Sequence, residues 1–280
     1  MRFDRIVTLG LVHTLRRFRM KSSCPVLPIL MYHSISDDPE PGFGPYYKVC
    51  TSPRRFSEHL QWLADLGCRG VTLSEGLAWL ADEPRSSSTS PPPVAITFDD
   101  GFRDFATTAF PALQRHGFSA TMYLPTAFIG DAPRRFKDRD CMTWADVSEL
   151  HGAGVEFGSH TVNHPKLVEL AWPDIAAELR ESKATIEQRL GTLVASFAYP
   201  YAFPQGNRTF SMRFCAELAE AGDHTGCTTA SGQVRATTNR LILPRLPANS
   251  ADDQSLFEAK LRGDYDWMGL PQLLRKKLKG

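Results

Sequence analysis

The chain has 280 residues, of which 42% are hydrophobic, and it carries 32 basic against 31 acidic residues. This length suits one large α/β domain or two small ones, and the near-neutral charge argues against a general nucleic-acid binder. Six cysteines are scattered without a C-x-x-C pair. A thiol metal site is therefore not predicted, and free thiols in a reducing compartment are expected.

The two ends of the chain are apolar and basic. Residues 1–25 begin MRFDRIVTLGLVHTLRRFRMK, where a short apolar run is followed by arginines without a small-residue cleavage site. Neither a signal peptide nor a transmembrane helix is predicted. This segment can form an amphipathic helix, and the C-terminal LLRKKLKG has the same character. We expect a cytoplasmic protein with solvated ends, and peripheral contact with the anionic inner membrane face is the alternative.

Between these ends, strand and helix patterns alternate. The sequence predicts a strand over 26–32, a helix from 53 capped by Ser52, a short strand over 71–73 and a helix capped by Ser74. After a polar loop over 82–93, further strands are expected at 94–98, 119–124, 155–158, 193–198, 225–229 and 241–244. Helices are expected at 104–115, 144–151, 173–190, 208–221 and 252–262.

This alternation predicts parallel strands with helices outside them. We expect a distorted (β/α) barrel with about seven parallel strands, and a doubly wound open sheet is the alternative. The predicted organisation is an extension over 1–25, one domain over 26–250 and a basic helical tail over 251–280.

Polar residues follow the ends of several expected strands. The stretch AITF ends on two adjacent carboxylates, SHTVNHP follows the strand over 155–158, and YPYAFPQGN follows the strand over 193–198. The carboxyl ends of parallel strands form the active-site face of such folds. We therefore expect the following residues to converge on one rim: His33, Asp99, Asp100, His160, His164 and Arg245.

The types of these residues indicate metal-assisted hydrolysis. Two adjacent buried carboxylates repel each other and lose hydration, so a cation is expected beside them. Pro165 disfavours a helix at His164, and the glutamate of H-E-x-x-H is absent, so a zincin protease is not predicted. Two imidazoles and one carboxylate leave open positions on a divalent metal, and the other carboxylate can act as a general base. A backbone N–H near Tyr201 can stabilise an oxyanion, and a histidine can protonate the departing amine.

The motifs TFDDG, SHTVNHP and FAYPY, in this order, resemble those of the polysaccharide deacetylases, the NodB-homology group of carbohydrate esterase family 4, over roughly 26–250. The resemblance implies a distorted (β/α) barrel that removes N-acetyl groups from N-acetylglucosamine-type sugars of an exopolysaccharide or chitooligosaccharide. It also implies a divalent metal, usually Zn²⁺, with Co²⁺, Ni²⁺ or Fe²⁺ as alternatives.

The resemblance also implies roles for single residues. Asp99 matches the catalytic base, and the metal ligands are Asp100, His160 and His164. The substrate carbonyl is expected near the backbone of Tyr201, with Tyr199 and Pro200 beside it. The chain is most similar to the branch that acts on poly-N-acetylglucosamine. In that branch an early MYH segment supplies the acid, here His33, and Arg245 in LPRLP matches the arginine that orients the base.

Two other functions stay open from the sequence. One is a deformylase or deacylase of a lipid-linked amino sugar, which would suit basic, apolar ends. The other is a sugar-binding module without catalysis. The sequence argues against it, because every expected catalytic role has a candidate residue.

Overall fold

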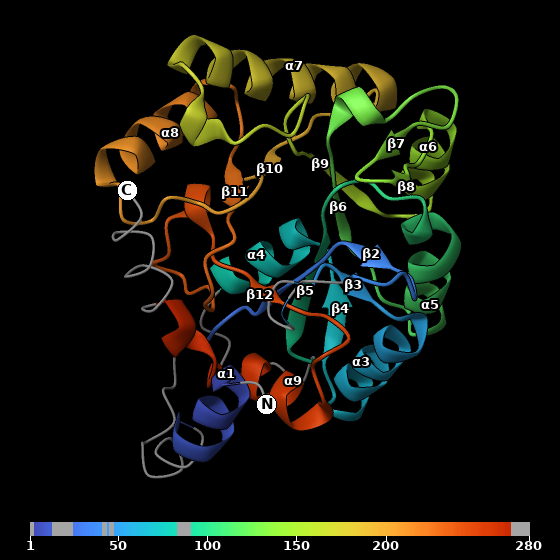
Figure 1. The fold of residues 1–280 in the computed structure, drawn as a ribbon, viewed down its shortest axis with the longest axis vertical. Coiled ribbons are helices and arrows are strands. Elements are labelled where there is room, and N and C mark those ends of the chain that lie inside the picture. Colours follow the sequence, from blue (N-terminus) through green and yellow to red (C-terminus); the bar gives the residue numbers. More distant parts are fainter. Residues whose placement is uncertain (1–2, 13–24, 41–43, 45–47, 83–90, 270–280) are drawn as a thin grey trace.

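The computed structural model describes residues 3–12, 25–40, 44, 48–82 and 91–269. Within them an all-parallel sheet curls into a distorted barrel, in the order β11-β10-β9-β6-β5-β1-β12, with β4 paired to β5 (Figure 1). The barrel prediction is confirmed, with eight strands instead of about seven. The strands are β1 Ile29–Tyr32, β4 Arg69–Val71, β5 Pro93–Phe98, β6 Thr121–Leu124, β9 Glu156–Ser159, β10 Ser196–Ala198, β11 Thr225–Cys227 and β12 Leu246–Pro247.

One short segment, residues 243–247, closes the ring because it pairs with β11 at its start and with β1 at its end. Leu243 pairs with Cys227 of β11, and Leu246 pairs with Leu30 of β1, all in parallel. The strand predicted over 241–244 is wrong, because Arg240–Ile242 form a 3-10 helix. Arg245 therefore lies between the two pairings and not beyond the end of a strand.

Residues of each strand alternate between the inside and the outside of the barrel. An inner cluster contains Ile29, Ala95, Tyr123 and other small or apolar residues, whereas Leu30, Ile96 and Phe98 pack outward against helices. Helix α4 (Leu73–Ala81) packs its leucines into the inner cluster and lies within the ring in Figure 1. It begins after Thr72, not after Ser74 as predicted, because Thr72 and Glu75 form a capping box.

Other helices cover the outside of the ring (Figure 1). The predicted cap Ser52 is confirmed, and Thr143 caps the helix expected over 144–151. The helix expected over 104–115 begins with π-helical turns, since Pro111 has no N–H to donate. The outer elements are α3 Pro53–Asp65, η3 Phe105–Ala109, α5 Phe110–Arg115, α6 Trp144–Gly152, α7 Trp172–Leu190 and α8 Arg208–Glu220.

The N-terminal segment lies against the C-terminal helices. It comprises α1 Phe3–Ile6 and the π-helix Val7–Val12, and it faces α9 Gln254–Leu261 and η7 Asp266–Met268. The Tyr265 hydroxyl donates to Asp4 at 2.6 Å, and the Trp267 indole donates to Thr8 at 3.0 Å. This contact buries polar side chains and leaves Phe3 74% exposed.

The predictions for the two ends concern mainly residues outside the described ranges. The basic stretches 13–24 and 270–280 belong there, so the proposed domain boundaries stay a prediction. Among the described helices, none combines the length and the apolar character that a bilayer crossing requires. The five cysteines in the described part of the chain are free thiols, as expected: Cys50, Cys68, Cys141, Cys215 and Cys227.

Candidate active site

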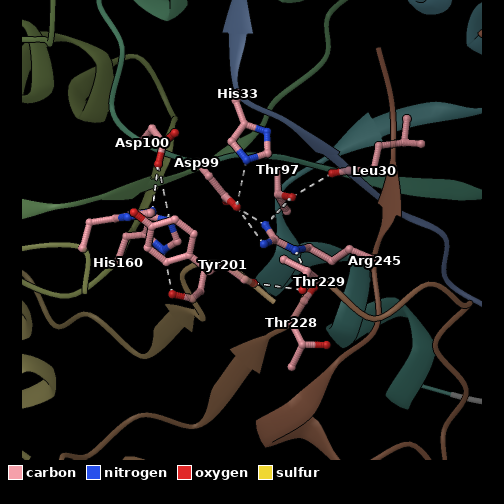
Figure 2. A network of polar contacts seen from close by, with 12 residues as sticks. Leu30, His33, Thr97, Asp99, Asp100, His160, Tyr201, Thr228, Thr229 and Arg245 are labelled. Carbon is pink, nitrogen blue, oxygen red and sulfur yellow. Dashed lines mark hydrogen bonds and ion pairs between the residues drawn. The ribbon is translucent and has the colours of Figure 1, made fainter. Parts of the chain in front are cut away.

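The six residues predicted to converge lie together at one rim of the barrel, and Figure 2 labels all of them except His164, which lies beside Asp100. Five follow the carboxyl ends of strands, whereas Arg245 lies between the pairings of Leu243 and Leu246. Strand alternation explains the inward direction of two of them. Asp99 continues the inner series of Ala95 and Thr97 on β5, and His33 continues the inner series of Ile29 on β1. A positive φ of 74° at Asp100 then turns the chain, so that the second carboxylate also lies at the rim.

Asp99 and Arg245 form a buried, two-pronged ion pair. The Arg245 guanidinium donates to both Asp99 oxygens at 2.7 Å, and it also donates to Thr97 Oγ1 and the Thr228 carbonyl. Arg245 is 0% exposed and Asp99 is 2% exposed. Burial raises the pKa of Asp99, but the charge and hydrogen bonds of Arg245 outweigh it, so the pKa lies below its usual value. Asp99 is therefore ionised at neutral pH and held in one orientation.

His33 faces the same carboxylate from the opposite side. Its Nε2 lies 3.9 Å from Asp99 Oδ2, and its side chain is 18% exposed. Burial lowers the pKa of His33, although Asp100 and Asp99 act in the other direction. His33 is thus a titratable group between the buried base and the open side of the rim.

Asp100, His160 and His164 form a buried group whose ligand atoms lie within 4.8 Å of one another. Asp100 Oδ1 lies 3.6 Å from His160 Nε2 and 3.2 Å from His164 Nε2. The His160 Nδ1–H donates to the Ala198 carbonyl at 2.7 Å, which orients the ring so that Nε2 faces Asp100. Burial lowers the pKa of His164 to about 4, so the His164 ring is neutral at pH 7.

This arrangement fits a metal ion. Asp100 Oδ1 is buried and has no hydrogen-bond partner among the described residues, although the Nε2 atoms of both histidines face it. Tetrahedral zinc with bonds near 2.0–2.1 Å would separate its ligand atoms by about 3.4 Å. Burial raises the pKa of Asp100, yet His160, His164 and Lys137 together hold it well below its usual range. The carboxylate is therefore ionised and able to bind a cation.

Lys137 is a rim residue that the sequence reasoning missed. Its Nζ donates to Asp100 Oδ2 at 3.0 Å from the turn between β7 (Arg135–Phe136) and β8 (Arg139–Asp140). No sequence signal marked this hairpin, because its two turn residues lack the Asn-Gly or Asp-Gly pattern.

The third motif contributes one exposed ring and one buried ring. Tyr201 has a φ of 58° and is 47% exposed, and its ring lies edge-on to His164 at 4.6 Å. Tyr199 packs with Phe203 and Phe214 in an apolar cluster and is 1% exposed, so its ring is part of the core. Pro200 joins the two and is also buried. The assignment of this motif to the substrate carbonyl stays a prediction.

The fold and the site define a (β/α)-barrel enzyme with an Asp-His-His group able to hold one metal ion. Residues 86–222 match the family model described as polysaccharide deacetylase. The chain therefore carries a domain of the polysaccharide deacetylase family.

Individual relatives agree with this family. The Bacillus subtilis protein YxkH, whose name assigns it to the polysaccharide deacetylases provisionally, is 27% identical over 83% of this chain and 75% of its own length. The poly-β-1,6-N-acetyl-D-glucosamine N-deacetylase of Staphylococcus aureus is 23% identical over 70% of this chain and 66% of its own length. The Streptococcus pyogenes deacetylase PplD, solved with acetate, is 26% identical, with a TM-score of 0.69 over 85% of this chain and 99% of PplD.

Proposed function

We propose that this protein is a metal-dependent deacetylase of N-acetylglucosamine-type units in an oligo- or polysaccharide. One observation carries the proposal: the buried Oδ1 of Asp100, which has no hydrogen-bond partner among the described residues, faces two imidazoles, beside a second carboxylate fixed by Arg245. Sequence similarity to a poly-β-1,6-N-acetyl-D-glucosamine N-deacetylase supports the substrate class.

The residues of the chain have separate tasks in this proposal. Asp100, His160 and His164 would hold a divalent metal, with Zn²⁺ favoured by the two nitrogen ligands. When bound, the ion would polarise the amide carbonyl and lower the pKa of water to about 7. Asp99 accepts the proton of the attacking water, and Arg245 keeps its carboxylate aimed at the rim.

Two further groups act on the amide itself. The backbone N–H of Tyr201 donates to the carbonyl oxygen as negative charge develops there. His33 gives a proton to the departing amine, since its ring lies next to Asp99 and is more exposed than that carboxylate. Hydrolysis then leaves acetate and a free amino sugar.

Chelation of the purified protein should abolish acetate release from N-acetylglucosamine oligomers, and returned Zn²⁺ should restore it. The physical reason is that Asp100 and the two imidazoles would hold the ion that polarises the amide carbonyl and activates water. The measurement pairs metal analysis with an acetate assay. Bound metal without acetate release would contradict the acetyl specificity, and protein that binds no metal would contradict the whole site.

Replacing His33 with alanine should lower kcat by about 100-fold or more, the usual contribution of a general acid, while metal content stays at the wild-type level. His224→Ala is the matched control, because His224 is exposed and precedes β11, at the opposite end of the barrel from the rim. Wild-type turnover in His33→Ala would remove His33 from the mechanism.

A further inference from the structure

The hairpin formed by β7 and β8 carries a lysine to the metal group. Its two turn residues, Lys137 and Asp138, have φ of 50° and 60°, the conformation of the tight two-residue turn that joins antiparallel strands. The hairpin follows β6 in the chain, so it rises from the same rim as the catalytic residues.

The position of the hairpin is fixed by polar contacts on its second strand. The Arg139 guanidinium donates to Ser34 at 2.9 Å and to Ser36 at 3.0 Å, just beyond His33. The Arg103 amide donates to the Asp140 carbonyl at 2.8 Å, beyond the two aspartates of β5. The hairpin is therefore held by the segments that follow β1 and β5, the two strands that lead to His33 and to the paired aspartates.

Lys137 contacts one oxygen of the Asp100 carboxylate, and the other oxygen faces the two histidines. Its Nζ donates to Oδ2 at 3.0 Å, whereas Oδ1 faces His160 and His164. The ammonium lies 4.6 Å from the centre of the Phe136 ring and 5.6 Å from that of Tyr201, which restricts its position further. Because Lys137 contacts the other oxygen, it does not occupy the space between the three ligand atoms.

We infer that Lys137 is a positioning residue that keeps Asp100 Oδ2 away from the metal, so that Asp100 supplies Oδ1 alone. A carboxylate can bind a divalent ion through one oxygen or both, and catalytic sites need three protein ligands with an open position. A hydrogen bond on Oδ2 favours the first mode and preserves the room that water and the amide carbonyl need. This inference rests on the proposed metal site.

Loss of Lys137 should change metal affinity and turnover in opposite directions. Without the ammonium, Oδ2 becomes available as a second ligand, and a positive charge that repels the divalent ion is removed. Both effects tighten metal binding. The same change fills an open position, so kcat falls. A merely structural defect would instead weaken both properties.

The test compares Lys137→Met, Lys137→Arg and Lys166→Met in Co²⁺ titrations followed by visible absorption. Methionine has a similar stem without the charge, arginine retains a donor, and Lys166 is an exposed lysine paired with Glu169. We expect Lys137→Met to bind Co²⁺ about 10-fold more tightly, with weaker absorption bands from a higher coordination number. This change is as large as the usual effect of losing an outer-shell partner but opposite in direction, because such a loss ordinarily weakens metal binding. Lys137→Arg and Lys166→Met should resemble the wild type.

Acetate release by the Zn²⁺-loaded proteins completes the test, with about a 10-fold lower kcat expected for Lys137→Met. Equal or weaker Co²⁺ binding by Lys137→Met, with an unchanged spectrum, would overturn the inference. A wild-type protein without deacetylase activity would contradict the proposed function, but the Co²⁺ affinity and spectrum would still decide the role of Lys137.

Discussion

Asp99→Asn is expected to stop turnover while the metal stays bound, whereas Asp100→Ala is expected to lose both. Asp99 contacts Arg245 through both oxygens and lies outside the Asp-His-His group, so its removal takes away the base alone. A general base typically raises the reaction rate by about 10²–10⁴-fold, so we expect kcat of Asp99→Asn to fall by about this factor. Asp100 supplies the one carboxylate oxygen that both imidazoles face, so its loss leaves two histidine ligands without the negative charge that attracts the ion.

Metal content and acetate release, measured on the same samples, distinguish the two aspartates. Asp99→Asn leaves the buried Arg245 without its counter-charge, which destabilises the fold. The assays should therefore be run well below the melting temperature of the variant. Asp38→Asn is a suitable control, because this aspartate is exposed and contacts Arg139, away from both site carboxylates. Equal metal loss in Asp99→Asn and Asp100→Ala would reverse the two roles.

The barrel and most of its rim follow from local patterns. Alternation along β5 directs Ala95, Thr97 and Asp99 to one face, and the sequence already shows this spacing. The histidines of SHTVNHP and the paired aspartates can likewise be recognised from adjacent residues in the sequence. The T-x-x-E spacing of Thr72 and Glu75 is also local, and this capping-box pattern favours Thr72 over Ser74 as the cap.

The remaining parts of the site depend on contacts between distant segments. Arg245 comes to the inside because Leu243 pairs with β11 and Leu246 pairs with β1, and no nearby residue specifies either pairing. Lys137 reaches Asp100 from a hairpin without glycine, whose position depends on Arg139 and its partners. Periodicity predicts the face on which a residue lies, but it does not predict which loops meet above the rim.

Arg245→Met should destabilise the fold by about 3–5 kcal/mol, the usual cost of breaking a buried ion pair from one side. The variant leaves Asp99 ionised and 2% exposed beside an apolar side chain. Adding Asp99→Asn to Arg245→Met should recover part of this loss, because the unpaired charge is then gone. Arg54→Met, which removes an arginine that is 90% exposed, should cost less than about 0.5 kcal/mol.

The stability difference between wild type and Arg245→Met should also depend on pH. In the wild type the pKa of Asp99 is lowered by Arg245, so the pair stabilises the fold above the unfolded-state pKa of about 3.9. That contribution is lost as the pH falls through the folded-state value. In Arg245→Met burial still raises the pKa of Asp99, and only His160 and His33 act against it. The penalty for the buried charge therefore applies at neutral pH and disappears on protonation. Urea unfolding with chelator present, at pH 7 and near pH 4, should therefore show a gap that narrows in acid. A constant gap would mean that Arg245 stabilises the barrel by packing and not through the charge of Asp99.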